Sequence, residues 1–450
     1  MGTIRLRAGL KFAIATVFLL WTFHLLYSLR FAHDANYGSL DFRVYYFSAQ
    51  LLHGNHHADL YAGALNHFPL DVDAPPNSSL ALQAAKAGFP SIMLYIYPPL
   101  LADLLTPVSS FSIQIAAKLW LALNLLLVCA AMLPLAGLTR IRLLSVGFAV
   151  LVCSAFCFHP IQDTFCFGQV NVVLCALWAF GIWAYEREWV LTSAAVLAFA
   201  TALKVTPIVI FPLFLIWKDR RWLVGYFSSL VGLGAFIVSF NGFGELREFS
   251  AVASSMSGGT PRFDNQCISS VLTWFYYGHT FDHFSAQSVL PLRAPALTLA
   301  IKLTQALFYS LCLWLVWKSR KQATRRDRAS SIAIFALVAL CVAPVSWRSS
   351  YAIAIVPLVM QWTRWFQEKI QWVRLAVLAV TSALIWSSGF EFVDGFPLPM
   401  WLKIVAASAQ VFAVIVFCIV ELAALRNHPR LATIAPPLTA AQSSPSPSFH

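Results

Sequence analysis

A charged pair stands in the stretch SLDFRVYYFSAQLLHG, residues 39–54, shortly after the first apolar run of the chain. Asp41 and Arg43 attract attention because only 11% of the 450 residues are charged. A carboxylate here could act as a general base that takes a proton from an attacking hydroxyl, or it could pair structurally with a cation. If residues 41–52 form a helix, the two side chains point about 200° apart and do not face each other. We therefore expect Asp41 and Arg43 to have separate roles.

Further polar side chains interrupt apolar sequence elsewhere. Lys204, in ALKVTP, has apolar neighbours on both sides, so its ammonium needs an anionic partner or water. Amides could instead cap helices or join them, and an arginine could extend to the membrane interface. The other candidates are Gln169 and Asn171 in FGQVNVV, Asn265 and Gln266 in DNQCISS, and Trp347 and Arg348 in SWRSSY.

A lipid-linked sugar phosphodiester would use a carboxylate, cations and amides in one site. Breaking the bond between sugar C1 and the phosphate leaves a polyprenyl phosphate, and a lysine or arginine stabilises its growing negative charge. The carboxylate takes the proton of the acceptor hydroxyl that attacks the opposite face, and the leaving phosphate needs no general acid. This chemistry predicts Asp41 as the base of an inverting transfer, with Lys204 and Arg348 near the donor phosphate.

Composition indicates an all-α polytopic membrane protein. Hydrophobic residues make up 59% of the chain and the mean hydropathy is +0.71, which leaves too little polar surface for a soluble globule of this length. The net charge of +12 comes from short basic clusters between apolar runs, which argues against nucleic acid as a partner. The nine cysteines are scattered singly, so we interpret them as small core residues.

Apolar runs long enough to span a membrane predict about twelve helices, within a range of about ten to thirteen. The run 189–217 is broken at Lys204 and Pro207 and is expected to cross twice. Residues 95–111 are short and proline-broken, so we expect them to be re-entrant or interfacial. The runs lie near 12–28, 115–137, 143–158, 169–185, 189–217, 222–240, 296–317, 331–346, 351–366, 373–388 and 400–424.

Basic residues in short loops stay cytoplasmic, and their distribution places both termini inside. Arg30, Phe31 and His33 stand where a signal-peptide cleavage site should lie, so the first apolar run is expected to be retained as a helix. We expect one domain over 1–425 and a disordered cytoplasmic tail over 426–450. The outer face is expected to carry the long loops 29–94 and 241–295 and the turns 159–168, 204–206, 346–350 and 389–399.

Six segments, taken in order, resemble glycosyltransferase family 87. The resemblance runs from about residue 10 to residue 370, and it rests on the order of the segments rather than on any single one. They are LDFRVYYFSAQLLHG with a later DLY, YIYPPLL, GQVNVVLCALWAFG, ATALKVTPIVIFPLFL with a later DRRW, NQCISSVL and SWRSSYAIAIVPL.

The resemblance implies a GT-C fold and a polyprenyl-phosphate-sugar-dependent enzyme, as in the mycobacterial α-1,2-mannosyltransferases of the family. The expected reaction moves a hexose, expected to be mannose, to a lipid or glycan acceptor at the outer face of a bacterial cytoplasmic membrane. Asp41 is then the catalytic base, and membrane lipids are partners. The expected cavity residues are Tyr45, Gln169, Asn171, Lys204, Asn265, Gln266 and Trp347.

This chain departs from the family at one place. Where members commonly read Ser-Trp-x-His-Tyr, it reads Ser-Trp-Arg-Ser-Ser-Tyr over residues 346–351, so a histidine expected near the donor phosphate is absent. Arg348 is the candidate substitute.

Two groups could bind a metal. Asp71 and Asp73 form an Asp-x-Asp pair, and His53, His56 and His57 lie close together in the sequence. A lipid monophosphate donor does not require a metal, and the histidines have no fixed helical spacing. We expect solvated loops at both places and no cofactor.

Two other classes of function remain open from the sequence. A secondary transporter or flippase for a lipid-linked or anionic substrate would also carry intramembrane charges, but should show broken helices in two corresponding halves. A non-catalytic lipid-binding or assembly protein could pair Asp41 with Arg43 or Arg348. Full activity of an Asp41→Asn variant would favour the last class.

Overall fold

The computed structural model describes residues 40–54, 60–61, 73–256, 264–278, 294–367, 371–387 and 397–425. Within these ranges the regular structure is helical, with two isolated β-bridges and no strand. The predicted all-α class is confirmed.

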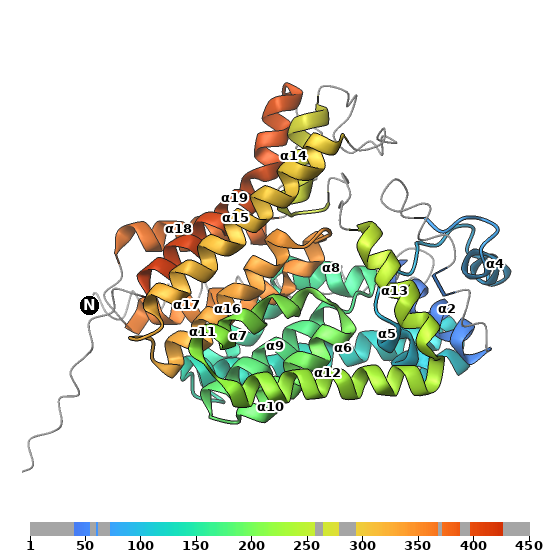
Figure 1. Ribbon diagram of the computed structural model, residues 1–450, viewed down its shortest axis with the longest axis horizontal. Coiled ribbons are helices and arrows are strands. Elements are labelled where there is room, and N and C mark those ends of the chain that lie inside the picture. Colours follow the sequence, from blue (N-terminus) through green and yellow to red (C-terminus); the bar gives the residue numbers. More distant parts are fainter. Residues whose placement is uncertain are drawn as a thin grey trace, which may run out of the picture.

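Four of the described helices are long and apolar enough to cross a membrane, and a fifth span results if α7 (Val146–Phe156) and α8 (His159–Phe167), bent by 52°, count as one. Only 11% of the apolar window of α12 is buried, so most of its surface is left to face lipid. The chain is a multi-pass membrane protein. The four helices are α6 (Ile113–Thr139), α12 (Arg220–Asn241), α15 (Pro295–Ser319) and α19 (Met400–Ala424). In Figure 1, α12 lies along the lower edge of the molecule, and α15 and α19 extend obliquely at the top.

The remaining apolar helices are shorter than a full span, so the count of about twelve crossings stays a prediction. The expected first span, 12–28, lies outside the described residues. The break at Lys204 is confirmed: α10 ends at Leu203, Lys204 is extended (φ −154°, ψ 118°), and Pro207 stands in the first turn of the next helix. The shorter helices are α9 (Asn171–Glu186), α10 (Val190–Leu203), η3 (Thr206–Ile210), α11 (Phe211–Trp217) and α18 (Trp372–Trp386).

The centre of the bundle is α16 (Arg325–Val342), which is buried along almost its whole length. Its first turn is fixed by a Thr324–Asp327 capping box, and Arg364 of α17 (Ile355–Gln367) donates to Asp327 Oδ1 at 2.7 Å. Because α16 is held on all sides, it gives a rigid base to the segment that follows, which includes η6 (Arg348–Ala354).

A second apolar cluster lies at one end of the bundle, on the right in Figure 1. Here α2 (Leu40–His53) is helical, as predicted for residues 41–52. Pro98, Pro99 and Pro107 limit the next helices to short pieces, which agrees with a re-entrant or interfacial segment over 95–111. The helices at this end are α2 (Leu40–His53), α4 (Ser79–Lys86), α5 (Pro99–Leu105), η2 (Thr106–Ser110) and α13 (Phe243–Ser255); α14 (Ile268–Tyr277) packs with α15 and α19.

The expected turn at 159–168 is wrong. These residues form the helix α8, which packs against η6. Pro160 stands in its first turn and Gly168, at φ +69°, ends it, and this proline-to-glycine order is a helix signal. The helix brings Asp163 and the turn after it into the core.

Glu245 on α13 provides a test of how this end of the bundle is packed. Burial, together with the nearby carboxylates of Glu248 and Asp103, raises the pKa of Glu245 to about 8. An unfolded glutamate has a pKa of about 4.3, so the folded protein holds an extra proton between these values and loses stability as pH rises through that window. Glu245→Gln should therefore melt at a higher temperature than the wild type at pH 9 and at nearly the same temperature at pH 4, below the unfolded pKa. If the melting temperatures of the variant and the wild type changed in parallel across this pH range, the burial of Glu245 on α13 would be contradicted.

Candidate active site

Asp41 lies in the first turn of α2 and is 8% exposed. Gln169 Nε2 donates a hydrogen bond of 2.8 Å to Asp41 Oδ2. Gly168 allows this approach, because a Cβ there would lie 2.6 Å from Phe42 Cβ. Trp120 Nε1 donates to the Gly168 carbonyl at 2.8 Å and holds the turn in place. The α8–α9 turn is thus built to meet the start of α2.

A continuous set of hydrogen bonds leads from Gln169 to Lys204. Gln169 Oε1 accepts from both Asn171 Nδ2 and Ser349 Oγ. Lys204 Nζ in turn donates to Asn171 Oδ1 at 3.2 Å and to Ser350 Oγ at 3.1 Å. A carboxylate and an ammonium that are far apart in the sequence are therefore joined through amides and hydroxyls.

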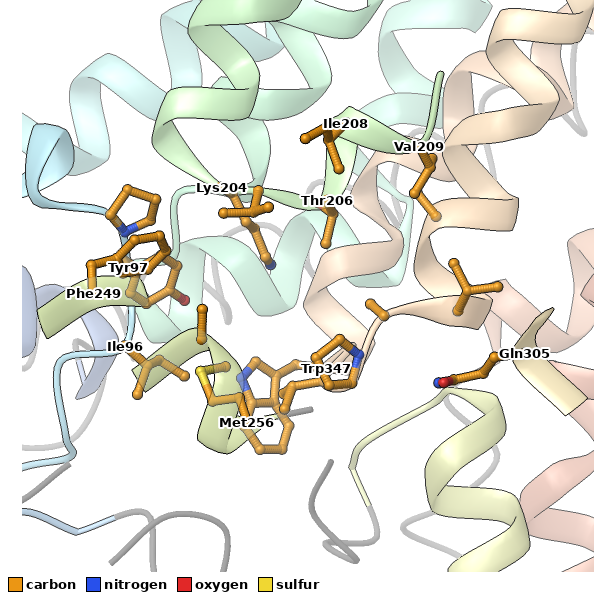
Figure 2. Close-up of a pocket in the computed structure, with 18 of the residues that line it drawn as sticks. Ile96, Tyr97, Lys204, Thr206, Ile208, Val209, Phe249, Met256, Gln305 and Trp347 are labelled. Atoms are coloured by element: carbon orange, nitrogen blue, oxygen red, sulfur yellow. The ribbon is translucent and has the colours of Figure 1, made fainter. Parts of the chain in front are cut away.

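Lys204 opens onto a cavity of about 420 Å³. Its walls come from η3, α13, α15 and the end of α16, and they are mostly apolar. Figure 2 shows the ammonium pointing into the space between Tyr97, Met256 and Trp347. Lys204 lies in the connection between α10 and η3; burial lowers its pKa to about 8, and the Asp41 carboxylate opposes this shift. The ammonium is thus mainly charged at neutral pH.

Asp41 reaches the same region through a slot of about 20 Å³. The slot shares Ile96, Tyr97 and Trp347 with the large cavity. Its volume is close to that needed by one water molecule, so it admits a hydroxyl but not a sugar ring. The carboxylate thus lines a slot beside the cavity that the ammonium lines, and the two share part of their walls.

The structure brings five of the predicted site residues together. Asp41, Gln169, Asn171 and Lys204 form the network, and Trp347 lines both the slot and the cavity. Tyr45 is buried behind them, with its ring edge against the ring of Tyr97 at a centroid distance of 5.0 Å.

Asn265 and Gln266 support the site from behind. Asn265 Oδ1 accepts a hydrogen bond of 2.7 Å from the backbone N–H of Ser346. The backbone N–H of Gln266 donates to the backbone carbonyl of Ser346, also at 2.7 Å. The Gln266 carbonyl also accepts from Tyr351 Oη at 2.8 Å. Neither residue lines the cavity. These bonds position the segment that carries Trp347 and Ser350.

Arg348 is not brought to the cavity. Its Nε lies 4.0 Å from Asp163 Oδ2, and His159 Nδ1 lies 3.3 Å from the same oxygen. The guanidinium therefore faces a carboxylate on α8, and Arg348 is absent from the residues that line the cavity. Its role at the donor phosphate stays a prediction that this arrangement does not favour.

Arg43 points away from Asp41, as predicted. Its guanidinium lies 4.4 Å above the ring of Phe89, in a cation–π contact within the outer cluster. The two side chains are placed apart as predicted, whereas their separate roles stay a prediction.

Three residues near the site were missed by the sequence analysis: Tyr97, Ser349 and Ser350. The serines are ordinary hydroxyls in the sequence, and only the fold places them beside Gln169 and Lys204. Tyr97 precedes Pro98, which favours an extended backbone, but this signal does not indicate that the ring reaches Asp41. Burial, with a contribution from the Asp41 carboxylate, raises the pKa of Tyr97 well above its usual value, so its hydroxyl stays protonated.

A network that joins a carboxylate to a buried cation beside an apolar cavity fits a membrane glycosyltransferase. The chain belongs to glycosyltransferase family 87, whose model matches residues 95–344. This confirms the resemblance seen in the sequence, over a shorter range than expected. Gln169, Asn171 and Lys204 lie inside the matched residues, whereas Asp41 and Ser349 lie outside them.

Among curated proteins, the chain is similar to a polyprenol-phosphate-mannose-dependent α-(1-2)-phosphatidylinositol mannoside mannosyltransferase of Mycobacterium tuberculosis (strain ATCC 25618 / H37Rv). The two are 25% identical over 279 residues, which is 56% of this chain and 58% of the relative. The chain therefore matches a little over half the length of this relative.

Proposed function

We propose that the protein transfers a hexose, with mannose as the first candidate, from a polyprenyl-phosphate donor to a lipid or glycan acceptor with inversion at C1. The observation that carries the proposal is the hydrogen-bond network that joins Asp41 to Lys204, with Asp41 in a slot that shares walls with the cavity at Lys204. The similarity to a mycobacterial mannosyltransferase that depends on polyprenol-phosphate mannose supports the donor class.

In the proposed reaction the acceptor hydroxyl enters the slot at Asp41 and attacks sugar C1. Asp41 takes the hydroxyl proton as the new bond forms, and Gln169 holds the carboxylate in place. The bond from C1 to the phosphate oxygen breaks on the other face, and polyprenyl phosphate leaves. Lys204 stabilises the negative charge that develops on the leaving phosphate. This role for a side-chain cation is why the proposal includes no metal.

The apolar cavity walls suit a prenyl chain and support a site reached from the membrane. We place the site at the outer face of a bacterial cytoplasmic membrane, within a single GT-C-like unit of about twelve spans with both termini cytoplasmic. Two long expected outer loops contribute to it, through Asp41 in α2 and through α13.

Purified protein incubated with a panel of polyprenyl-phosphate sugars tests the proposal. We expect one member of the panel, with mannose tested first, to lose its sugar to an added glycolipid acceptor and release polyprenyl phosphate. Turnover of a nucleotide sugar in place of every lipid-linked donor would contradict it.

Tyr97→Phe tests whether the reacting sugar lies between the slot and the cavity. The variant keeps the ring and removes only the hydroxyl that Figure 2 shows at the cavity, so we expect turnover to fall about tenfold, the scale of one lost hydrogen bond. Tyr95→Phe is the matched control. Its hydroxyl donates to the Pro98 carbonyl at 2.8 Å, so its loss should lower the melting temperature instead. Equal turnover of Tyr97→Phe and the wild type would remove Tyr97 from the site.

A further inference from the structure

Two polar residues on α15 line the wall of the cavity. Lys302 and Gln305 are three residues apart on the helix, so they share one face. α15 begins at Pro295, and both residues lie within about 15 Å of this end, measured along the helix axis. In Figure 2 the carboxamide of Gln305 extends toward Trp347. Most of the rest of the lining is apolar.

Gln305 carries an unsatisfied donor. Its Nε2 is buried and has no hydrogen-bond partner within the described part of the chain. Buried amide donors are almost always paired, because leaving one unpaired is costly. A rotation of the carboxamide would bring Nε2 to an oxygen atom of a ligand in the cavity and satisfy it. An interfacial lysine that extends to water would explain Lys302 alone, but not Gln305.

The charge balance of the cavity points to an anion. Lys204 already has a countercharge in Asp41, to which it is joined through Asn171 and Gln169. Lys302 is an exposed lysine with no ion pair within the described residues, and no acidic side chain of those residues lines the cavity. One uncompensated positive charge matches the single negative charge of a phosphodiester.

We propose that Lys302 and Gln305 form a second phosphate-binding element of this cavity, which holds the phosphate group of a prenyl-linked sugar from the side opposite the protein network at Lys204. This inference rests on the proposed function. Lys302 supplies the charge, and Gln305 Nε2 donates to a phosphate oxygen. Neither residue was among the site residues expected from the sequence.

Binding of polyprenyl monophosphate and of uncharged polyprenol to the full-length protein in lipid nanodiscs tests the inference without requiring turnover. We expect the wild type to prefer the phosphate, and Lys302→Gln and Gln305→Leu each to weaken phosphate binding about tenfold while leaving polyprenol binding unchanged. Lys302→Arg should keep most of the affinity. Lys318→Gln is the matched control, because Lys318 is near the other end of α15, stacked on Trp314, and does not line the cavity.

Unchanged phosphate binding by both Lys302→Gln and Gln305→Leu would overturn the inference. Nanodiscs that contain phosphatidylinositol separate a second source of phosphate: if Lys302→Gln weakens only the binding of that lipid, the assignment to the donor is wrong. A failure of the proposed function can be told apart from a failure of this inference. Binding that depends on Lys302 without any sugar transfer would keep the inference and reject the function, whereas transfer with Lys302-independent binding would do the reverse.

Discussion

Asp41→Asn is expected to keep donor binding and to lower turnover at least about a hundredfold, the usual scale for a lost general base. Asparagine preserves the shape of the side chain and can still bond to Gln169 if one amide turns, so the network and the cavity should remain. What is lost is the ability to take the proton of the acceptor hydroxyl. Initial rates and donor dissociation constants, measured on the same preparation, separate the two effects.

Arg43→Gln is the control for Asp41→Asn. Its guanidinium contacts Phe89 on the far side of α2, so we expect a milder loss of activity together with some loss of stability. Normal turnover of Asp41→Asn beside an inactive Arg43→Gln would make the cation the essential member of this stretch and the proposed mechanism wrong.

Lys204→Met is expected to lower turnover by about a hundredfold to a thousandfold, the scale found when one preorganised group that stabilises a developing anion is removed. Methionine keeps much of the length and apolar character of the side chain, so the cavity should stay closed by its apolar walls. The hydrogen bonds to Asn171 and Ser350 are lost, and the donor loses its nearest fixed cation. Single-turnover rates report this step directly.

Lys118→Met is a matched control for Lys204→Met, because Lys118 lies on the exposed face of α6 and away from the cavity. It should turn over like the wild type. A Lys204→Met enzyme that folds and works normally would remove Lys204 from the site.

The sequence was sufficient to single out Lys204 because it is a charge in a place where charge is costly, whereas Asp41 was chosen from the chemistry of the proposed reaction and from the family resemblance. A lysine between apolar segments needs a partner, whatever the fold. The same argument identified the break after Leu203, since Pro207 cannot continue the preceding helix.

Other features depend on contacts between distant segments, which no local pattern specifies. Ser349 and Ser350 meet Gln169 and Lys204 only because η6 packs against α8 and α9. Arg348 was predicted near the phosphate as a substitute for the absent family histidine, and only the fold shows that it lies beside Asp163 of α8. The sequence gives the type of each residue but not the neighbour that takes its charge.

The number of membrane crossings could not be fixed from apolar runs for a related reason. In a bundle of this size, helices such as α9 and α16 are apolar because other helices surround them, not because lipid does. Hydropathy alone therefore cannot separate a buried helix from a span.

The configuration of the product at the transferred C1 tests the central claim most directly. Wild-type protein is given a polyprenyl-phosphate sugar of known anomeric form, and the glycolipid product is analysed by NMR. A base at Asp41 that activates the acceptor on the face opposite the leaving phosphate predicts a product of the opposite anomeric configuration. Retention of the donor configuration would contradict the account, because it requires attack from the face that the phosphate leaves or a covalent intermediate.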